Sequence, residues 1–172
     1  MVMKNKIILQ ETVKQLTERF KDSSDCIKIS HILSKFYEIG EEIEYLNSGG
    51  CAVVAYSIVE YSKLLGIDAK VRYLFNDWSL SDYRNLTNNK NGSCSHAVVL
   101  INGLLYDSNG EFEVQGGECE YTTLELEQDK VLESISYPKH WNRAFNRRDG
   151  RKKIQSVLGI PIKITKYSSL VA

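Results

Sequence analysis

Apolar residues recur along this chain with spacings typical of helices. Spacings of three and four, which place side chains on one face of a helix, predict amphipathic helices over residues 9–21 and 25–39. We expect Gly40 to end the second of these helices, because glycine is the usual residue just after a helix. Residues 51–65 are almost continuously apolar and predict a largely buried helix that Gly66 closes.

An alternation of apolar and polar positions predicts strands in the middle of the chain. Residues 69–75 alternate with a period of two, which is typical of a strand. A β-hairpin is the clearest local signal: strands over 95–101 and 104–108 are joined by Asn102-Gly103, the strongest short hairpin turn. Residues 76–93 are rich in Asn, Asp and Ser and predict a long loop.

The last third of the chain predicts a mixture of short elements. Residues 121–133 suggest an extended piece followed by a short helix, and residues 141–145 and 152–158 have helical spacing. Residues 160–167 predict a last strand. Helices first and mostly antiparallel strands afterwards favour the α+β class. Because no repeat or linker divides the 172 residues, we expect a single domain over 1–172.

Composition limits the partners and the location that we expect. Hydrophobic residues make up 42% and charged residues 26%, which is typical of a globular domain and excludes disorder as the main state. The 22 Lys and Arg balance the 22 Asp and Glu, so no overall field attracts nucleic acid or anionic lipid. No apolar run approaches the ~20 residues of a membrane span. We therefore expect a cytoplasmic protein with no membrane partner.

A basic stretch from Arg143 to Lys153 is the local exception to this charge balance. Trp141 and Phe145 are interleaved with it, and basic and aromatic residues together can bind nucleic acid or an acidic partner. A solvated helix face, balanced by acidic residues elsewhere, is the simpler interpretation. We therefore expect no nucleic-acid partner.

Cys51 is the first candidate for chemistry. It follows Gly49-Gly50 and opens the predicted buried helix. The first N–H groups of a helix have no internal partner, and the helix dipole places partial positive charge there. Both effects lower the pKa of a cysteine and make its thiolate a better nucleophile. Taken alone, Cys51 is better explained as a small apolar residue at the start of a buried helix.

The other cysteines give no sign of a metal site or of a disulfide framework. No pair of cysteines has the C-x-x-C spacing of a zinc site, and four in 172 residues are too few for a disulfide scaffold. We therefore expect no metal and no cofactor. Three cysteines are interpreted as incidental free thiols: Cys26, Cys94 and Cys119.

The predicted hairpin brings a histidine and an aspartate to one face of the sheet. With Asn102-Gly103 at the turn, His96 and Asp107 project to the same side as diagonal neighbours. A carboxylate there can bind one imidazole nitrogen and hold the other toward a third group as a base. A one-residue bulge would change this register and make Asn109 the competing orienting residue.

The order and context of these residues resemble the transglutaminase-like branch of the papain-like cysteine hydrolase superfamily. In that pattern a Cys opens a helix, a strand follows, a His opens a strand and an Asp ends the next one. The resemblance covers residues 49–110 and is carried by Gly50-Cys51, Leu65-Gly66-Ile67, Ser95-His96-Ala97-Val98-Val99 and Tyr106-Asp107.

This resemblance implies a fold and a set of roles. It implies a papain-like fold with N-terminal helices and the nucleophile helix packed on an antiparallel sheet. It implies that Cys51 is the nucleophile, His96 the base and later the acid, and Asp107 the residue that orients His96. Members that need calcium carry acidic residues just after the Cys, whereas this chain has Ala52-Val53-Val54, which favours a site without metal.

Acyl transfer of this kind also needs an oxyanion hole with two donors near the sulfur. The backbone N–H of Cys51 is the natural first donor, and the side chain of Asn47 or the hydroxyl of Tyr45 is the candidate for the second. A further group of residues is expected to line the substrate cleft: Gly49, Gly50, Trp78 and Ser95.

The reactions of this superfamily share acyl transfer through a cysteine thioester. Our leading hypothesis is a cysteine hydrolase, of peptidase or amidase type, that acts on an amide or isopeptide bond of a protein or peptide. A transglutaminase-like deamidase or acyltransferase with the same triad stays open. So does a peptidoglycan amidohydrolase, and so does a catalytically degenerate papain-like domain that binds a partner.

Overall fold

A computed structural model gives the fold of the protein and describes residues 25–43, 46, 50–88, 90, 92–112, 121–136 and 149–161. Helices pack on one five-stranded antiparallel sheet, which confirms the predicted α+β class. The helices predicted over 9–21 and 141–145 lie outside the described residues. So does residue 162 onward of the last predicted strand, and Ile160 and Pro161 are not in a strand.

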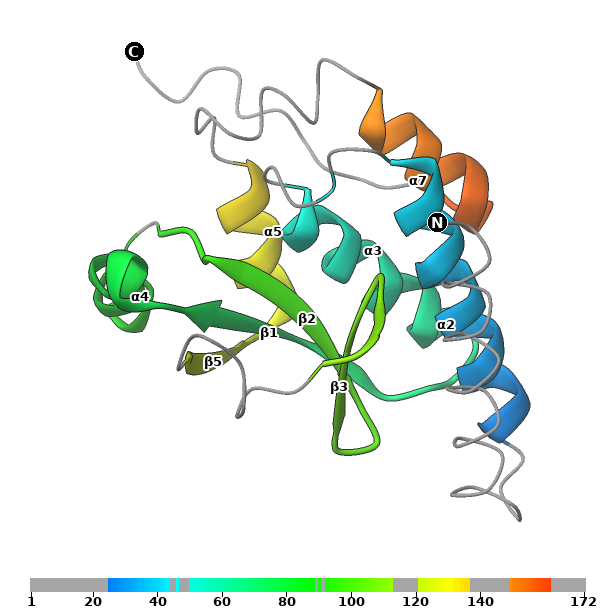
Figure 1. The fold of residues 1–172 in the computed structure, drawn as a ribbon, viewed down its shortest axis with the longest axis horizontal. Helices are drawn as coiled ribbons and strands as arrows, with labels where there is room; N and C mark the ends of the chain where they lie inside the picture. The colour runs from blue at the N-terminus through cyan, green and yellow to red at the C-terminus, as the bar shows by residue number, and fades with distance from the viewer. Residues whose placement is uncertain are drawn as a thin grey trace.

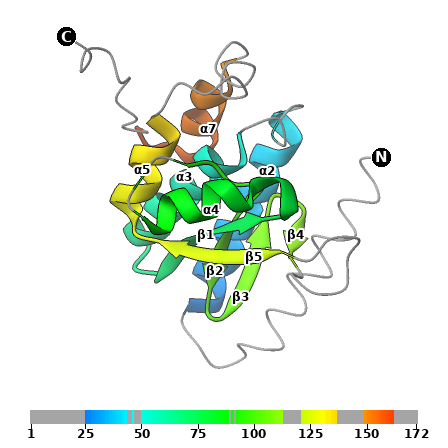
Figure 2. The same cartoon turned by 90° about the vertical axis from the view of Figure 1, so that its left-hand side faces the viewer.

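The sheet is built around the two strands that lie on either side of α4 in the chain. Its strand order is β4-β3-β2-β1-β5, and every neighbouring pair is antiparallel. Figure 2 shows the sheet as a layer beneath the helices. The strands are β1 (Ala69–Phe75), β2 (His96–Ile101), β3 (Leu104–Asp107), β4 (Gly110–Glu111) and β5 (Thr122–Leu126).

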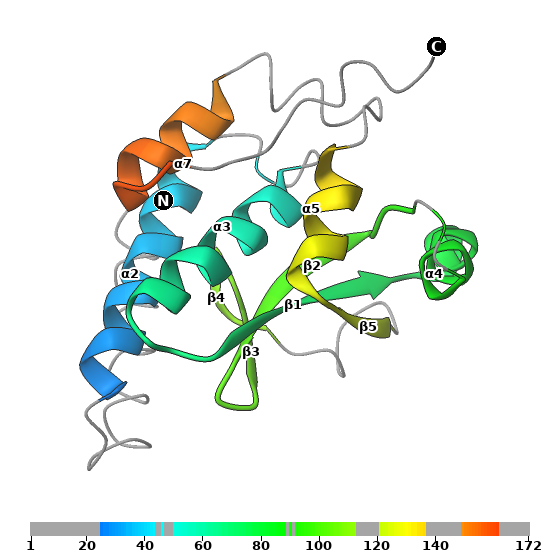
Figure 3. The same cartoon turned by 180° about the vertical axis from the view of Figure 1, so that it is seen from behind.

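Helix α3 lies at the centre of the helical layer. It packs on β1 and β2, with α2 and α7 to one side of it and α5 to the other (Figures 1 and 3). Within the described part of the chain, none of the helices has the length and apolar character needed to cross a membrane. The helices are α2 (Asp25–Glu42), α3 (Cys51–Leu64), α4 (Leu80–Thr87), α5 (Gln128–Ser136) and α7 (Gly150–Leu158), with a 3-10 turn η1 (Asp77–Ser79) before α4.

The core forms between α3 and the sheet because both surfaces are continuously apolar. Ten of the fourteen residues of α3 are buried, as the apolar run predicted. Alternate side chains of the two central strands pack against the helix, including Val71 and Tyr73 of β1 and Val99 of β2, each fully buried. An antiparallel sheet commonly packs one face on the core in this way.

The predicted hairpin is confirmed in turn type and register. Asn102 and Gly103 have φ angles of 49° and 82°, and two successive positive φ values are what a type I′ turn requires. Leu100 pairs with Leu105 and Val99 with Tyr106, so no bulge interrupts this ladder. This register places His96 and Asp107 on one face of the sheet.

The prediction of a long loop over residues 76–93 is wrong. Much of this segment is helical, in η1 and α4. The half-buried Leu80, Tyr83 and Leu86 pack on the core, and Tyr83 meets the ring of Phe75 edge-on with centroids 5.4 Å apart. The polar composition of the segment hides the three-residue spacing of these contacts.

Gly40 does not end α2, which continues to Glu42. Its missing side chain instead lets the helix approach the turn after β3. A Cβ atom at this position would lie 2.9 Å from the Cβ and 3.2 Å from the carbonyl oxygen of Ser108. Tertiary packing, rather than helix capping, therefore explains this glycine.

We expect Gly40→Ala to lower the free energy of unfolding by about 1 kcal/mol. Overpacking against Ser108 costs about 1–3 kcal/mol, which exceeds the roughly 1 kcal/mol that alanine gains as a helix former. Urea unfolding followed by circular dichroism measures the change. Ser34→Ala, at an exposed position of the same helix, is the control and should be neutral or slightly stabilising. A Gly40→Ala midpoint at or above the wild-type value would contradict the packing argument.

Candidate active site

Cys51 is the first residue of α3, as the sequence predicted. Gly50 precedes it as the N-cap with a φ of −90°, and its carbonyl accepts the N–H of Val54 at 3.0 Å. No acidic residue lies in the first turn of the helix. The helix dipole therefore acts on the Cys51 sulfur, and it favours the thiolate. The residue is 5% exposed, so solvent screens this effect little.

His96 begins β2 and forms a hydrogen bond with Asp107, the last residue of β3. The His96 Nε2 atom lies 3.0 Å from Asp107 Oδ2, and the two side chains are 17% and 12% exposed. This is the contact that the hairpin register predicted. Because Nε2 is occupied, Nδ1 is the nitrogen available to the Cys51 sulfur.

Asp107 is held at both carboxylate oxygens. While Oδ2 bonds to His96, Oδ1 accepts the backbone N–H of Asn109 at 2.7 Å. Asn109 is therefore not a competing partner of His96 in this structure. It contributes its backbone to the orientation of Asp107, in the manner of an Asx turn.

Phe112 packs beside the His96 ring, a contact that the sequence analysis missed. The two ring centroids are 5.4 Å apart with the planes tilted by 42°. The backbone N–H of Phe112 donates to Leu105 at 2.7 Å, which continues the pairing of β4 with β3. A second tight turn after Asp107 could have been recognised from Gly110, whose φ is 124°, and it would have placed Phe112 on the histidine's face.

Cys94 is a buried free thiol with 8% exposure, and it is one of the groups that lower the pKa of Cys51. Cys94 lies two residues before His96, and residues two apart in an extended chain share a side. That relation to the predicted histidine was the one signal in the sequence that could have found it.

The surroundings of Cys51 favour its thiolate. The hydrogen bond from Cys94 lowers the pKa of Cys51 most, and burial opposes it by raising the pKa. A hydrogen bond from His96, the charge of His96 and the backbone N–H of Ala97 lower the pKa further. The net pKa of Cys51 lies well below its usual value.

The surroundings of His96 favour its charged imidazolium. Burial lowers the pKa of His96, but the hydrogen bonds to Asp107 and Cys51 and the charges of these two groups outweigh it. The pKa of His96 is raised to about 9. Together the two shifts favour a thiolate–imidazolium pair, whose two titrations are coupled.

Ser95 and Trp78, predicted to line a cleft, lie where η1 meets the start of β2. The Ser95 hydroxyl donates to Asn76 Oδ1 at 2.8 Å and lies 2.6 Å from the Ser79 hydroxyl. Ser95 thus ties η1 to the segment that leads into His96. Trp78, within η1, is 93% exposed. Gly50 is at the helix start, and the other predicted residues, Tyr45, Asn47 and Gly49, lie outside the described residues.

Two of the three basic residues in the described part of the basic stretch, Lys152 and Lys153, have structural partners. Lys153 Nζ donates to the Glu42 carbonyl at 2.8 Å, where a cation favourably meets the C-terminal end of α2. Lys152 pairs with Asp149 at 3.0 Å. These contacts agree with a solvated helix face. Arg143, Arg147 and Arg148 lie outside the described residues.

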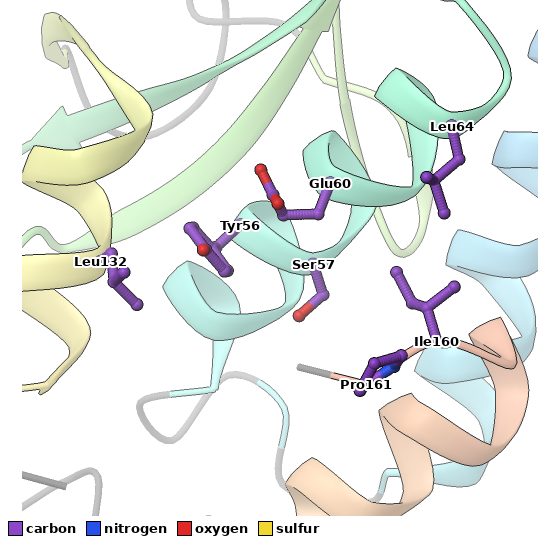
Figure 4. A pocket seen from close by; sticks show the side chains of 7 residues that line it. All are labelled: Tyr56, Ser57, Glu60, Leu64, Leu132, Ile160 and Pro161. Carbon is purple, nitrogen blue, oxygen red and sulfur yellow. The ribbon is translucent and has the colours of Figure 1, made fainter. Parts of the chain in front are cut away.

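A cavity of about 420 Å³ lies on α3 but away from Cys51. Figure 4 shows it between α3, α5 and the end of α7. Its first lining residue, Tyr56, is five residues along the helix from Cys51, which is about 7.5 Å of axial rise. The Ser57 hydroxyl already donates to Val53, and Glu60 already accepts from Lys63 and Gln128. The Ser57 hydroxyl and the Glu60 carboxylate are therefore already engaged in contacts outside the candidate site.

Comparison with protein-family models, with curated proteins and with solved structures finds no match for this chain. The chemistry of the site is accordingly argued from its own geometry. Among the residues that the structure describes, no group of three or more His, Cys, Asp or Glu side chains is placed to hold a metal ion. What the site brings together is a buried thiol, an imidazole and a carboxylate in series.

We expect Asp107→Ala to lower the pKa of His96 from about 9, because burial then opposes the charged imidazolium and only Cys51 is left to favour it. Titration of the His96 ring by NMR measures this shift. Asp107→Asn keeps a hydrogen-bond acceptor but not the charge. The pKa of His96 in this variant should therefore lie between its values in the wild type and in Asp107→Ala. A His96 pKa that does not respond to Asp107→Ala would contradict the hydrogen bond seen here.

Proposed function

We propose that the protein is a cysteine hydrolase of the transglutaminase-like, papain-like type, acting on an amide or isopeptide bond of a protein or peptide. One observation carries the proposal. Asp107 and the Cys51 thiol at the start of α3 both act to raise the pKa of His96, whose Nε2 atom is 3.0 Å from Asp107 Oδ2. A nucleophile, a base and an orienting carboxylate linked in this order are what acyl transfer through a thioester requires.

In the first half of the reaction the Cys51 thiolate attacks the carbonyl carbon of the amide. A carbon–sulfur bond forms, and the carbonyl electron pair moves to the oxygen. The imidazolium of His96 then gives its proton to the amide nitrogen, the carbon–nitrogen bond breaks and the amine leaves. Because His96 is already charged near neutral pH, this acid is present before the substrate arrives.

In the second half neutral His96 acts as the base. It takes a proton from water, the hydroxide attacks the thioester carbon, and the carbon–sulfur bond breaks. The acid product leaves, and the thiolate–imidazolium pair is restored. Asp107 keeps its orientation throughout, since its Oδ1 is held by the Asn109 backbone. The Cys51 backbone N–H, at the free end of α3, is the donor proposed for the oxyanion.

The arrangement of the fold supports the same proposal. The candidate nucleophile begins a buried helix, and that helix packs on the antiparallel strand that begins with the candidate base. Trp78 precedes Ser79, which contacts Ser95, and its 93% exposed side chain offers an aromatic surface for a peptide substrate.

The test is trapping of an acyl-enzyme from an activated ester such as p-nitrophenyl acetate. We expect a burst of p-nitrophenol and an acetyl group on Cys51, located by mass spectrometry of peptides. Cys51→Ser and His96→Ala should abolish the burst, since each lacks one half of the ion pair. Cys26→Ala, which changes a thiol in α2, should keep it. An unmodified Cys51, or a label distributed over all cysteines, would contradict the proposal.

The nature of the acceptor separates hydrolysis from the related reactions of the same triad. With glutamine-containing peptides, chain cleavage supports a peptidase. Ammonia release without cleavage, or capture of an added amine, would instead assign deamidation or acyl transfer. Complete lack of acyl-enzyme with an intact fold would favour a partner-binding domain over any enzyme.

A further inference from the structure

The ring of Phe112 belongs to a row of aromatic side chains that begins at the candidate base. The centroids of the His96 imidazole and the Phe112 ring are 5.4 Å apart, and the two planes are tilted by 42°. The Phe112 ring also meets Tyr121 edge-on, with centroids 6.2 Å apart and an angle of 60° between the planes. Aromatic pairs at such distances attract each other beyond the area that they bury. Phe112 is therefore held by contacts with both neighbours.

The backbone on either side of this row also has a fixed position. Phe112 follows β4, and its N–H donates to the Leu105 carbonyl of β3 at 2.7 Å. Tyr121 directly precedes β5, which pairs with β1. Since β4 and β5 are the two outermost strands of the sheet, the contact between Phe112 and Tyr121 spans the face that carries His96. The ring beside the imidazole is thus anchored at both edges of the sheet.

The imidazole of His96 lies on an apolar part of this face. Leu74, which pairs with His96 across β1 and β2, is fully buried, and so is Val98, two residues further along β2. The His96 side chain itself is only 17% exposed. Because little water reaches the imidazole, an adjacent ring acts on its charge more strongly than it would in solution.

Ionisable side chains of other elements also face His96 or act on its charge. Asp107 of β3 lies 3.0 Å from His96 Nε2, and Cys51 of α3 raises the pKa of His96 as well. Arg72 of β1 shares the face of the sheet with His96 but is already paired with Glu125 of β5 at 3.1 Å. An aromatic ring carries no net charge, so its effect can be separated from theirs by changing the ring alone.

We propose that Phe112 is a positioning residue for the candidate base: its ring packs against the imidazole of His96, keeps Nε2 directed at Asp107 and stabilises positive charge on the imidazole. This inference rests on the function proposed above. A cation within about 6 Å of an aromatic centroid is attracted by the negative face of the ring. In the proposed reaction this favours the imidazolium that gives its proton to the leaving amine, and Phe112 forms no bond at any step.

The first experiment changes the electron density of the Phe112 ring and keeps its shape. Phenylalanines of increasing fluorine content are incorporated at position 112, and NMR measures the pKa of His96 in each protein. Fluorine withdraws negative charge from the ring face, so the pKa should fall stepwise from about 9, by about one unit over the series. The same series at Phe36, buried in α2, is the control and should leave this pKa in place.

A second set of variants tests the orientation of the imidazole. Phe112→Ala removes the packing ring, and we expect loss of the downfield NMR resonance of the Nε2 proton shared with Asp107, because that proton then exchanges with water. Phe112→Tyr keeps the ring and should restore the resonance. Thermal unfolding verifies that each variant is folded. A resonance that persists in folded Phe112→Ala would overturn the positioning role.

The wild type is assayed in parallel for the acyl-enzyme on Cys51. If it forms and the pKa of His96 does not change over the fluorinated series at position 112, the role of Phe112 is wrong and the proposed function stands. A pKa that falls equally with fluorination at position 36 would also overturn the role of Phe112. If the wild type forms no acyl-enzyme, the proposed function fails, and the role of Phe112 in the reaction fails with it.

Discussion

The packing of α3 on β1 and β2 determines where every group of the candidate site lies. Val53, Val54 and Ile58 of this helix are fully buried, so its rotation and its depth against the sheet are set by the core. Because the helix starts at Cys51, the same packing fixes the sulfur beside the first residues of β2. Protein interiors are close-packed, and a helix held on this much of its surface does not slide to suit its end.

A charge pair in so closed a place needs hydrogen bonds on both partners. Removing a thiolate and an imidazolium from water is expensive, and the attraction between them offsets this only with good geometry. Here Cys51 has Cys94, His96 and the Ala97 N–H around it, and His96 has Asp107. The contact behind Asp107 matters for the same reason. The Asn109 N–H donates to the Asp107 carboxylate, and that carboxylate in turn orients the imidazole of His96.

Local signals predicted the parts of the structure that local physics determines. The Asn102-Gly103 turn fixes the hairpin register, and the register puts His96 and Asp107 together without reference to the rest of the chain. Features that depend on tertiary contact were missed. The sequence around Gly40 predicts a helix end, because its close approach to Ser108 depends on the tertiary fold.

The missed parts of the site have the same origin. The sequence predicts an incidental thiol at Cys94 because Cys51, whose pKa it lowers, is 43 positions earlier in the chain. A spacing of that length does not indicate that two residues lie close together. The sequence predicts a loop where α4 lies, because the few apolar residues that pack on the core are surrounded by Asn, Asp and Ser residues. The proposed second oxyanion donors, Asn47 and Tyr45, lie outside the described residues and stay predictions.

Reactivity and recognition are divided between two sets of residues. In the described part of the chain, the groups that set the charge on the sulfur are buried and already have partners, so they have little capacity left to select a substrate. On the proposed function, selection depends on exposed groups instead, and Trp78, at 93%, is the most exposed large hydrophobic side chain among the described residues. Such a division lets the surface change without disturbing the buried ion pair, because changes at distant, independent sites usually add.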